Sequence, residues 1–349
     1  MGNEPLAPFD AVLLLSFGGP EAPDEVMPFL EYVTRGRGIP RERLESVATH
    51  YYDFGGVSPI NAQNRELLAA LEPQLRESGS SLPVHWGNRN SQPWLREVAV
   101  RMAESGVRRP LVLVTSAYSS YSGCRQYRED LAQAFADLDV EVGKVAQFFD
   151  AEGFIRANAE ALASKLAAAP TDARILFVTH SIPVTAHAAR YVAQHEAVAR
   201  AILRELQAEE RPWSLVYCSR SGAPGQPWLE PDINDALREL AAQGLSEVVV
   251  APIGFVSDHM EVKFDLDTEA AATAAGLGMR MHRAATAGTH PAFVKGLVDL
   301  LRERAALERG EQEVRARRQL GIEPARFVCA PGCCANPRSQ RPALCGSDA

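Results

Sequence analysis

Two stretches of the sequence, LVLVTSAYSS at residues 111–120 and EVVVAPIGFVS at residues 247–257, decide the fold. Each begins with a run of aliphatic residues, which is typical of a strand buried on both faces of a parallel sheet. Each run leads into a loop of small and aromatic residues, and keeping one register between the two loops pairs Cys124 with Glu261. This internal likeness predicts that the chain repeats one structural unit.

Short apolar runs alternate with longer amphipathic stretches over the rest of the chain, which indicates β/α units around parallel sheets. We expect four strands in each half. Their predicted ranges are Ala11–Phe17, Leu82–Trp86, Leu111–Thr115, Val140–Ala146, Arg174–Thr179, Ser214–Cys218, Glu247–Pro252 and Gly278–His282. The pattern predicts an α/β fold of two similar, doubly wound, Rossmann-like halves, with a central cleft where the carboxyl ends of the strands face each other.

We divide the chain into three parts. Residues 1–167 form the N-terminal half and residues 168–320 the C-terminal half, with a linker at residues 168–172. The C-terminal half ends in a long charged helix predicted over residues 291–320, and residues 321–349 form a tail rich in Pro, Gly and Cys.

The charge and the N-terminus limit the partners and the location. The net charge of −8 provides no positive field for a nucleic acid or an anionic membrane. The apolar run Ala11–Leu15 is too short for a signal peptide or a membrane span, so we expect a cytoplasmic protein with no transmembrane segment.

The segment GFVSDHMEVKFDLDTE, residues 254–269, contains the most informative polar side chains. Ser257 or Asp258 can cap a helix that begins near Met260. Three carboxylates recur at i, i+4 spacing along this helix: Glu261, Asp265 and Glu269. A solvated acidic face is the alternative, but the helix directly follows a buried strand, so its first turn should face the cleft.

The segment FVTHSIP, residues 177–183, ends a predicted strand in His180, and Pro183 can start the next helix. A histidine that is only hydrogen-bonded at a strand end is the alternative. Together, His180 and Glu261 form a pair of groups that accept protons and bind metals at the cleft. An imidazole and a carboxylate suit a divalent ion such as ferrous iron, yet are too few to trap it as a structural metal.

Four strings in the sequence resemble signatures of the ferrochelatases, the enzymes that insert ferrous iron into a porphyrin. They are Phe17-Gly18-Gly19-Pro20, Gly55-Gly56-Val57-Ser58-Pro59, Thr179-His180-Ser181-Ile182-Pro183 and Gly254-Phe255-Val256-Ser257-Asp258-His259-Met260-Glu261. The resemblance covers nearly the whole chain. It implies that His180 and Glu261 bind the substrate iron and transfer protons, and that Asp265 and Glu269 form an acidic path for cations.

A porphyrin is a flat apolar disc with carboxylate arms, so it needs an aromatic slot with hydrogen-bond donors at its mouth. The resemblance implies that Ser58 and Tyr127 contact the porphyrin, and Phe17 stands where some relatives have a Tyr that reaches the metal. Phe17 cannot bind iron. Core packing is the alternative for each aromatic residue. The candidate wall residues are Phe17, Tyr51, Tyr52, Phe54, Tyr118 and Tyr127, and the candidate propionate-binding residues are Ser58, Arg35 and Arg37.

The tail is rich in cysteine, with Cys329, Cys333, Cys334 and Cys345. Thiolates select zinc or iron-sulfur centres, and incidental thiols on a disordered tail are the alternative. A branch of the ferrochelatases carries a 2Fe-2S cluster, and the resemblance to it implies that Cys124 is the fourth ligand and that one of Cys333 and Cys334 does not bind. We expect the cluster to fasten the tail to the N-terminal half, and Cys218 to be a small buried hydrophobic residue.

The cluster-bearing bacterial branch acts on coproporphyrin III, which the resemblance implies as the substrate, with protoporphyrin IX as the alternative. Transient contacts with the neighbouring enzymes of haem synthesis are also expected. Two other classes remain open: a two-lobed protein that only binds haem or a metal, and a cobalt chelatase, which would not require the cysteine tail.

Overall fold

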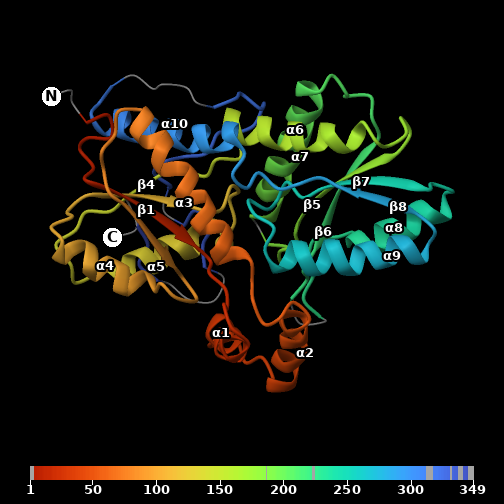
Figure 1. Ribbon diagram of the computed structural model, residues 1–349, viewed down its shortest axis with the longest axis horizontal. Helices are drawn as coiled ribbons and strands as arrows, with labels where there is room; N and C mark the ends of the chain where they lie inside the picture. The colour runs from red at the N-terminus through yellow and green to blue at the C-terminus, as the bar shows by residue number, and fades with distance from the viewer. Residues whose placement is uncertain are drawn as a thin grey trace.

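The computed structural model describes residues 4–185, 187–221, 225–311, 317–330, 332–336 and 341–344. Two four-stranded parallel sheets, with the orders β2-β1-β3-β4 and β6-β5-β7-β8, form the two halves of the molecule (Figure 1). The strands are β1 (Ala11–Ser16), β2 (Val84–Asn88), β3 (Pro110–Val114), β4 (Gly143–Lys144), β5 (Arg174–His180), β6 (Trp213–Cys218), β7 (Glu247–Ala251) and β8 (Arg280–Arg283). The fold class is confirmed, and each of the eight predicted strands overlaps an observed one, although β4 covers only two residues of the predicted range Val140–Ala146. The apolar runs of β1, β3, β5 and β7 are buried in the sheet interiors.

Helices cover both sheets (Figure 1). In the first half they are α1 (Val26–Thr34), α2 (Arg41–Tyr52), α3 (Ile60–Glu77), α4 (Leu95–Glu104), α5 (Gln126–Phe135) and α6 (Glu152–Leu166). In the second half they are α7 (Ala188–Glu205), α8 (Ile233–Ala242), α9 (Ala271–Gly276) and α10 (Pro291–Glu308). The largest hydrophobic core joins the halves, since it contains Leu14 of β1, Phe154 of α6, Phe177 of β5 and Phe293 of α10.

The two halves repeat one unusual feature. In each, the third strand of the chain order leads through a loop into a π-helix, a helix with i→i+5 hydrogen bonds that is often found at functional sites. The first is η2 (Tyr121–Arg125) and the second is η3 (Glu261–Ala270). Cys124 lies in η2 and Glu261 begins η3, so the internal likeness seen in the sequence corresponds to matching elements.

Three local predictions were wrong. The helix over residues 291–320 ends at Glu308, because Gly310 takes a positive φ of 73° and the Glu311 amide returns to the Ala306 carbonyl, which is a Schellman-type end. Pro183 does not start a helix: it forms a bridge with Trp228, and α7 begins later in the chain.

The expected cap of the acidic helix is also wrong. Neither Ser257 nor Asp258 caps it, since η3 has no side-chain cap and the Asp258 carboxylate instead accepts hydrogen bonds from Arg283 and Thr286. The boundaries at residues 167, 168, 320 and 321 stay a prediction, and α10 packs against α6 and α3 of the first half.

Candidate functional site

His180 is the last residue of β5, at the carboxyl end of the second sheet. Its Nδ1 lies 2.5 Å from the Ser181 carbonyl oxygen. A carbonyl only accepts, so Nδ1 carries the hydrogen and Nε2 keeps a lone pair. Burial, opposed in part by the nearby Glu261 charge, lowers the pKa of His180. The imidazole is therefore neutral at physiological pH and can accept a proton at Nε2.

Glu261 lies beside His259. The two side chains approach to 2.7 Å between Oε2 and Nδ1, at an angle outside that of a hydrogen bond. Burial opposes ionisation of Glu261, but the charges of His259 and His180 outweigh it and lower the pKa of Glu261 to about 2. The pKa of His259 is raised, because the Glu261 charge outweighs its burial. The Glu261 side chain is 39% exposed, so this carboxylate is ionised and open to a ligand.

The structure brings His180 and Glu261 together. Their charges shift each other's pKa, and His259 acts on both. The loop that carries Glu261 can approach β5 because Gly254 has no side chain: a Cβ there would lie 2.1 Å from the Thr179 hydroxyl. No group of three or more His, Cys, Asp or Glu within the described ranges forms a metal-binding cluster, so the pair does not belong to a preformed metal cage.

The acidic row follows η3 away from this pair. Asp265 receives a short hydrogen bond from Ser219, and Glu269 is exposed. Burial, together with the charges of Glu261 and Glu269, raises the pKa of Asp265 to about 7 despite the Ser219 bond. Residues four apart stay near one face of a π-helix, so the row leads from the Glu261 pair to solvent. Its role as a cation path stays a prediction.

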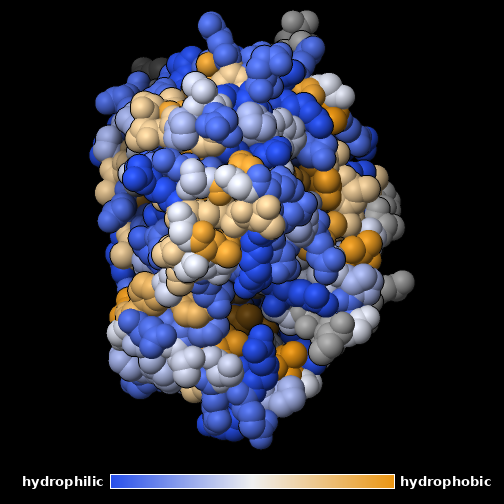
Figure 2. Space-filling model, turned by 90° about the vertical axis from the view of Figure 1, so that its right-hand side faces the viewer, coloured by the Kyte–Doolittle hydropathy of each residue, from blue (hydrophilic) through white to orange (hydrophobic). Residues whose placement is uncertain are grey.

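Residues of the N-terminal half contact the loop and helix that carry Glu261. Gln63 of α3 makes two hydrogen bonds to the backbone of Asp258, at 2.7 and 3.0 Å. On α2, the His50 ring stacks on the Phe264 ring of η3, 3.6 Å away between centroids. In Figure 2 a hollow with a hydrophobic floor opens in the lower part of the molecule, at the height where α2 lies below the second sheet in Figure 1.

Aromatic side chains extend from α2 toward the first sheet. Tyr51 meets Phe29 edge to face, and Phe29 meets Phe17 in the same way, with centroids 6.0 and 6.2 Å apart. The charges of Glu261 and Asp265 add to burial in raising the pKa of Tyr51. Tyr51 therefore lies near the acidic row, as expected of a wall residue of this site.

Tyr127 lies at the other end of this aromatic set. Its ring packs under the Arg89 guanidinium, with 4.4 Å between the carbon and the centroid, and the same guanidinium lies 5.8 Å from the Phe17 ring. Burial raises the pKa of Tyr127, and the Glu261 charge contributes. Tyr127 and Phe17 thus flank one arginine near the carboxylate.

The other predicted substrate residues lie in different surroundings. Tyr118 is 3% exposed in the main core, where its ring stacks on His195 and its hydroxyl donates to the Ile253 carbonyl, which corresponds to the core-packing alternative. Arg35 is exposed and folds back on Tyr32, 3.8 Å from its ring. Tyr52, Phe54 and Arg37 are also exposed, whereas Ser58 is buried.

Four predicted cluster ligands share a second hollow. It is lined by the thiols of Cys124, Cys329, Cys333 and Cys334, and by Gln147, Arg190 and Gln194 among others. The Cys333 and Cys334 sulfurs are 3.9 Å apart. Among the described residues these thiols do not form a metal-binding group, so the iron-sulfur cluster stays a prediction. Cys345 lies outside the described residues.

Positive and polar groups surround these thiols. Gln147 accepts from the Cys124 thiol at 3.2 Å and from Lys144, and Arg190 lies 3.5 Å from the Cys333 sulfur. The hydrogen bond with Cys329, with Lys144 and Arg128 nearby, lowers the pKa of Cys124 to about 6. The surroundings therefore favour the thiolate at Cys124, whereas the hydrogen bond with Cys124 raises the pKa of Cys329 and the hydrogen bond with Cys333 raises the pKa of Cys334. Cys218, by contrast, is 1% exposed in a hydrophobic cluster, as expected.

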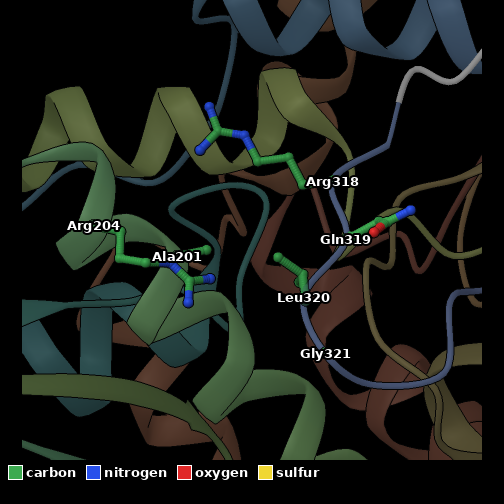
Figure 3. Close-up of a pocket in the computed structure, with 6 residues that line it drawn as sticks. All are labelled: Ala201, Arg204, Arg318, Gln319, Leu320 and Gly321. Atoms are coloured by element: carbon green, nitrogen blue, oxygen red, sulfur yellow. The ribbon is translucent and has the colours of Figure 1, made fainter.

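A third hollow, of about 410 Å³, lies between α7 and the segment after α10 (Figure 3). It is lined by Ala201, Arg204, Arg318, Gln319, Leu320 and Gly321. It is larger than the cysteine hollow, but none of the predicted site residues line it. Arg318 is already paired with Glu152 and Glu205, so its charge is satisfied within the protein.

Comparison with known proteins settles the family. Residues 9–305 match the family model described as ferrochelatase. The chain belongs to the ferrochelatase family. Among its ferrochelatase relatives, a coproporphyrin III ferrochelatase of Streptomyces griseus is 52% identical, with 98% of this chain and 97% of the relative covered. One from Leifsonia xyli is 47% identical over 99% and 95% of the two chains. A ferrochelatase of Rhodopirellula baltica is 46% identical over 94% of each.

Solved structures confirm the chelatase-type fold of this ferrochelatase. SirB from Bacillus subtilis with Fe3+ superposes with a TM-score of 0.54 at 12% identity, covering 87% of this chain and 98% of SirB. The sirohydrochlorin chelatase SirB in complex with cobalt gives 0.51 at 11% identity, with the same coverage. Within the described residues of the ferrochelatase chain, every helix is too short or too polar to span a membrane.

Sequence reasoning missed several residues of the site. His259 was expected near Glu261, but its effect on the Glu261 pKa was not. Arg89 follows β2 directly, and its position at a strand end is the signal that could have revealed it. Ser219 follows β6 directly and carries the same signal, and His50 directly precedes the predicted wall residue Tyr51.

Proposed function

We propose that this protein inserts ferrous iron into coproporphyrin III in haem synthesis, and that His180 and Glu261 carry the reaction. The observation that supports this most is the neutral imidazole beside an ionised carboxylate at the carboxyl end of β5. Metalation must remove two pyrrole protons and strip water from the ion. A base with a free Nε2 and a charged, weakly chelating oxygen meet both needs.

The reaction divides naturally between the two groups. The ferrous ion is the incoming substrate, and Glu261 supplies a hard, anionic oxygen that binds it without a closed coordination sphere. His180 Nε2 accepts the two pyrrole protons one after the other, releasing the first toward solvent before it takes the second, and His259 holds Glu261 in its charged form. Asp265 and Glu269 carry the cations or protons between this pair and solvent, since Asp265 has a pKa of about 7 and exchanges protons near neutral pH.

The porphyrin slot lies between the halves in this proposal. Phe17, Tyr51 and Tyr127 form its aromatic walls, and Ser58 donates near a propionate. Phe17 has no oxygen to bind iron, so the aromatic wall there excludes water from one face of the ring. Arg35 remains a candidate for a propionate at the exposed rim.

We also propose that Cys124 and three tail cysteines hold a 2Fe-2S cluster. The shared hollow, the soft donors and the neighbouring Lys144 and Arg190 support this. Bound there, the cluster would cross-link η2 to the tail and add a redox-active centre. Cys329 and Cys345 are proposed ligands with one of Cys333 and Cys334, and paired substitution of the last two tests which one binds.

The cytoplasmic location and transient contacts with neighbouring haem-synthesis enzymes stay predictions. The deciding experiment is an anaerobic insertion assay with ferrous iron that compares coproporphyrin III and protoporphyrin IX side by side. We expect repeated turnover and a higher kcat/KM for coproporphyrin III. Uptake of a single equivalent would indicate a binding protein, and a preference for protoporphyrin IX or for cobalt would overturn the assigned substrate.

A further inference from the structure

Arg89 has an unusual environment for an arginine. It follows β2, at the carboxyl end of the first sheet, and its side chain is only 4% exposed. Its Nε donates to the Asp130 carboxylate in a short ion pair. Within the part of the chain that the structure describes, its Nη1 has no hydrogen-bond partner. An unsatisfied buried donor on a charged group is costly, so it needs a ligand or another compensation.

The surroundings of Arg89 indicate what that ligand is. The guanidinium lies against the rings of Tyr127 and Phe17, the aromatic residues assigned to the porphyrin slot. The Glu261 charge also contributes to the raised pKa of the same Tyr127, so the two side chains interact electrostatically. The unused donor therefore lies at the edge of the first half's core, among residues assigned to the slot.

Local packing holds the Arg89 guanidinium in place. The Arg89 amide donates to the Ser16 carbonyl, and the Asn90 side chain donates to the Phe17 carbonyl, which fixes the loop after β2 to the end of β1. The ion pair with Asp130 fixes the guanidinium from the other side. A donor held this rigidly loses little conformational entropy when it binds a ligand.

We propose that Arg89 is a substrate-binding residue whose Nη1 donates a charge-assisted hydrogen bond to a propionate carboxylate of the porphyrin. This inference rests on the proposed function and deepens it. Arginine recognises carboxylates through directed N–H groups, and a carboxylate is the part of this substrate that needs such a donor. Arg89 orients the ring through this arm and takes no proton in the reaction.

Binding of metal-free coproporphyrin III, followed by fluorescence quenching, tests the inference. We compare the wild type with R89M, R89K and, as a matched control, R96M, since Arg96 pairs with Asp137 on the surface. Loss of a charged hydrogen bond should raise the Kd of R89M roughly ten- to a hundredfold, while kcat at saturating porphyrin changes less than threefold. R89K should recover most of the affinity, and R96M should match the wild type.

The uncharged tetramethyl ester of the same porphyrin, dispersed in mild detergent, separates the carboxylate from the ring. Wild type and R89M should bind the ester within twofold of each other. An equal loss for the acid and the ester, or a wild-type Kd in a folded R89M, would overturn the inference. If R89M does not fold, R89Q replaces it under the same criteria. Failure of the wild type to insert iron would instead refute the proposed function.

Discussion

The two π-helices occupy the same place in the two halves but carry different chemistry. In the first half η2 contributes Cys124 to a hollow that tail residues also line, and in the second half η3 begins with the partly exposed Glu261 carboxylate. A thiolate binds soft metals tightly, whereas a carboxylate binds a harder ion that must leave again. Under the proposed function, one repeated element would serve a retained centre in one half and a transient ion in the other.

The surrounding charges follow the same division. Lys144 and Arg190 surround the thiols, while the environment of Glu261 contains His180, His259 and the acidic row. Such positive groups would stabilise thiolates in the proposed cluster, although burial lowers the pKa of Lys144. Titratable groups favour proton transfer.

The largest effect should come from Glu261. The change Glu261→Gln keeps the size of the side chain but removes the charge, so kcat for iron insertion should fall about a hundredfold or more. The visible absorption of the cluster and the melting temperature should stay close to the wild type. Loss of the cluster in this variant would show that the Glu261 site and the cysteine site do not act independently.

The matching change in the other half is Cys124→Ser. We expect the visible absorption to disappear and the melting temperature to fall by a few degrees, because the cluster no longer links η2 to the tail. Cys218→Ala is the control, since Cys218 is buried away from the tail, and should keep the absorption. Full thermal stability of Cys124→Ser without absorption would show that the cluster does not fasten the tail.

The strands of both halves and the position of His180 could be predicted from the sequence. The apolar runs at β1, β3, β5 and β7 are buried on both faces, so their patterns identify the strands directly. The place of His180 at a strand end then follows from the rule that parallel sheets bind ligands there.

The rest depends on contacts that no local pattern encodes. A spacing of four residues fits both an α-helix and a π-helix, so the sequence could not distinguish them at Glu261, Asp265 and Glu269. The burial of Tyr118 against His195 and the ion pair of Arg89 with Asp130 join segments far apart in the chain. Aromatic residues suit a core and a slot equally well, so the sequence left both alternatives open for Tyr118.

A buried histidine near the junction of the halves gives the next prediction. His195 has a pKa of about 3, because burial disfavours its charged form. The lowered pKa means that its contribution to stability is complete above the unfolded pKa of 6.5 and is lost as pH falls toward 3. Compared with a pH above 6.5, the titration of this one group should lower the free energy of unfolding at pH 4.5 by about 3 kcal/mol.

Denaturant unfolding at several pH values measures this cost. The variant His195→Gln should lose less stability between pH 6.5 and 4.5 than the wild type, whatever its stability at pH 7. Parallel pH profiles for the two proteins would show that His195 does not titrate in this range.

The smallest effect concerns Tyr191 of α7. Its hydroxyl donates to the His180 carbonyl at 3.1 Å and lies 2.6 Å from the Thr179 hydroxyl. The change Tyr191→Phe should reduce stability by about 1 kcal/mol and kcat by a few-fold, with an unchanged porphyrin Kd. Thr185→Ala serves as the control, because Thr185 is exposed and lies shortly before α7, and this variant should match the wild type. A kcat equal to the wild type would show that this contact does not position His180.

The central claim is that the imidazole at 180 and the carboxylate at 261 act as one unit. The most direct measurement is a double-mutant cycle with H180A, E261Q and the combined variant, in anaerobic single-turnover iron insertion. If the two groups act together, the double variant should be no more than a few-fold slower than the slower single variant. Rate losses that multiply, with each group contributing independently, would contradict the account.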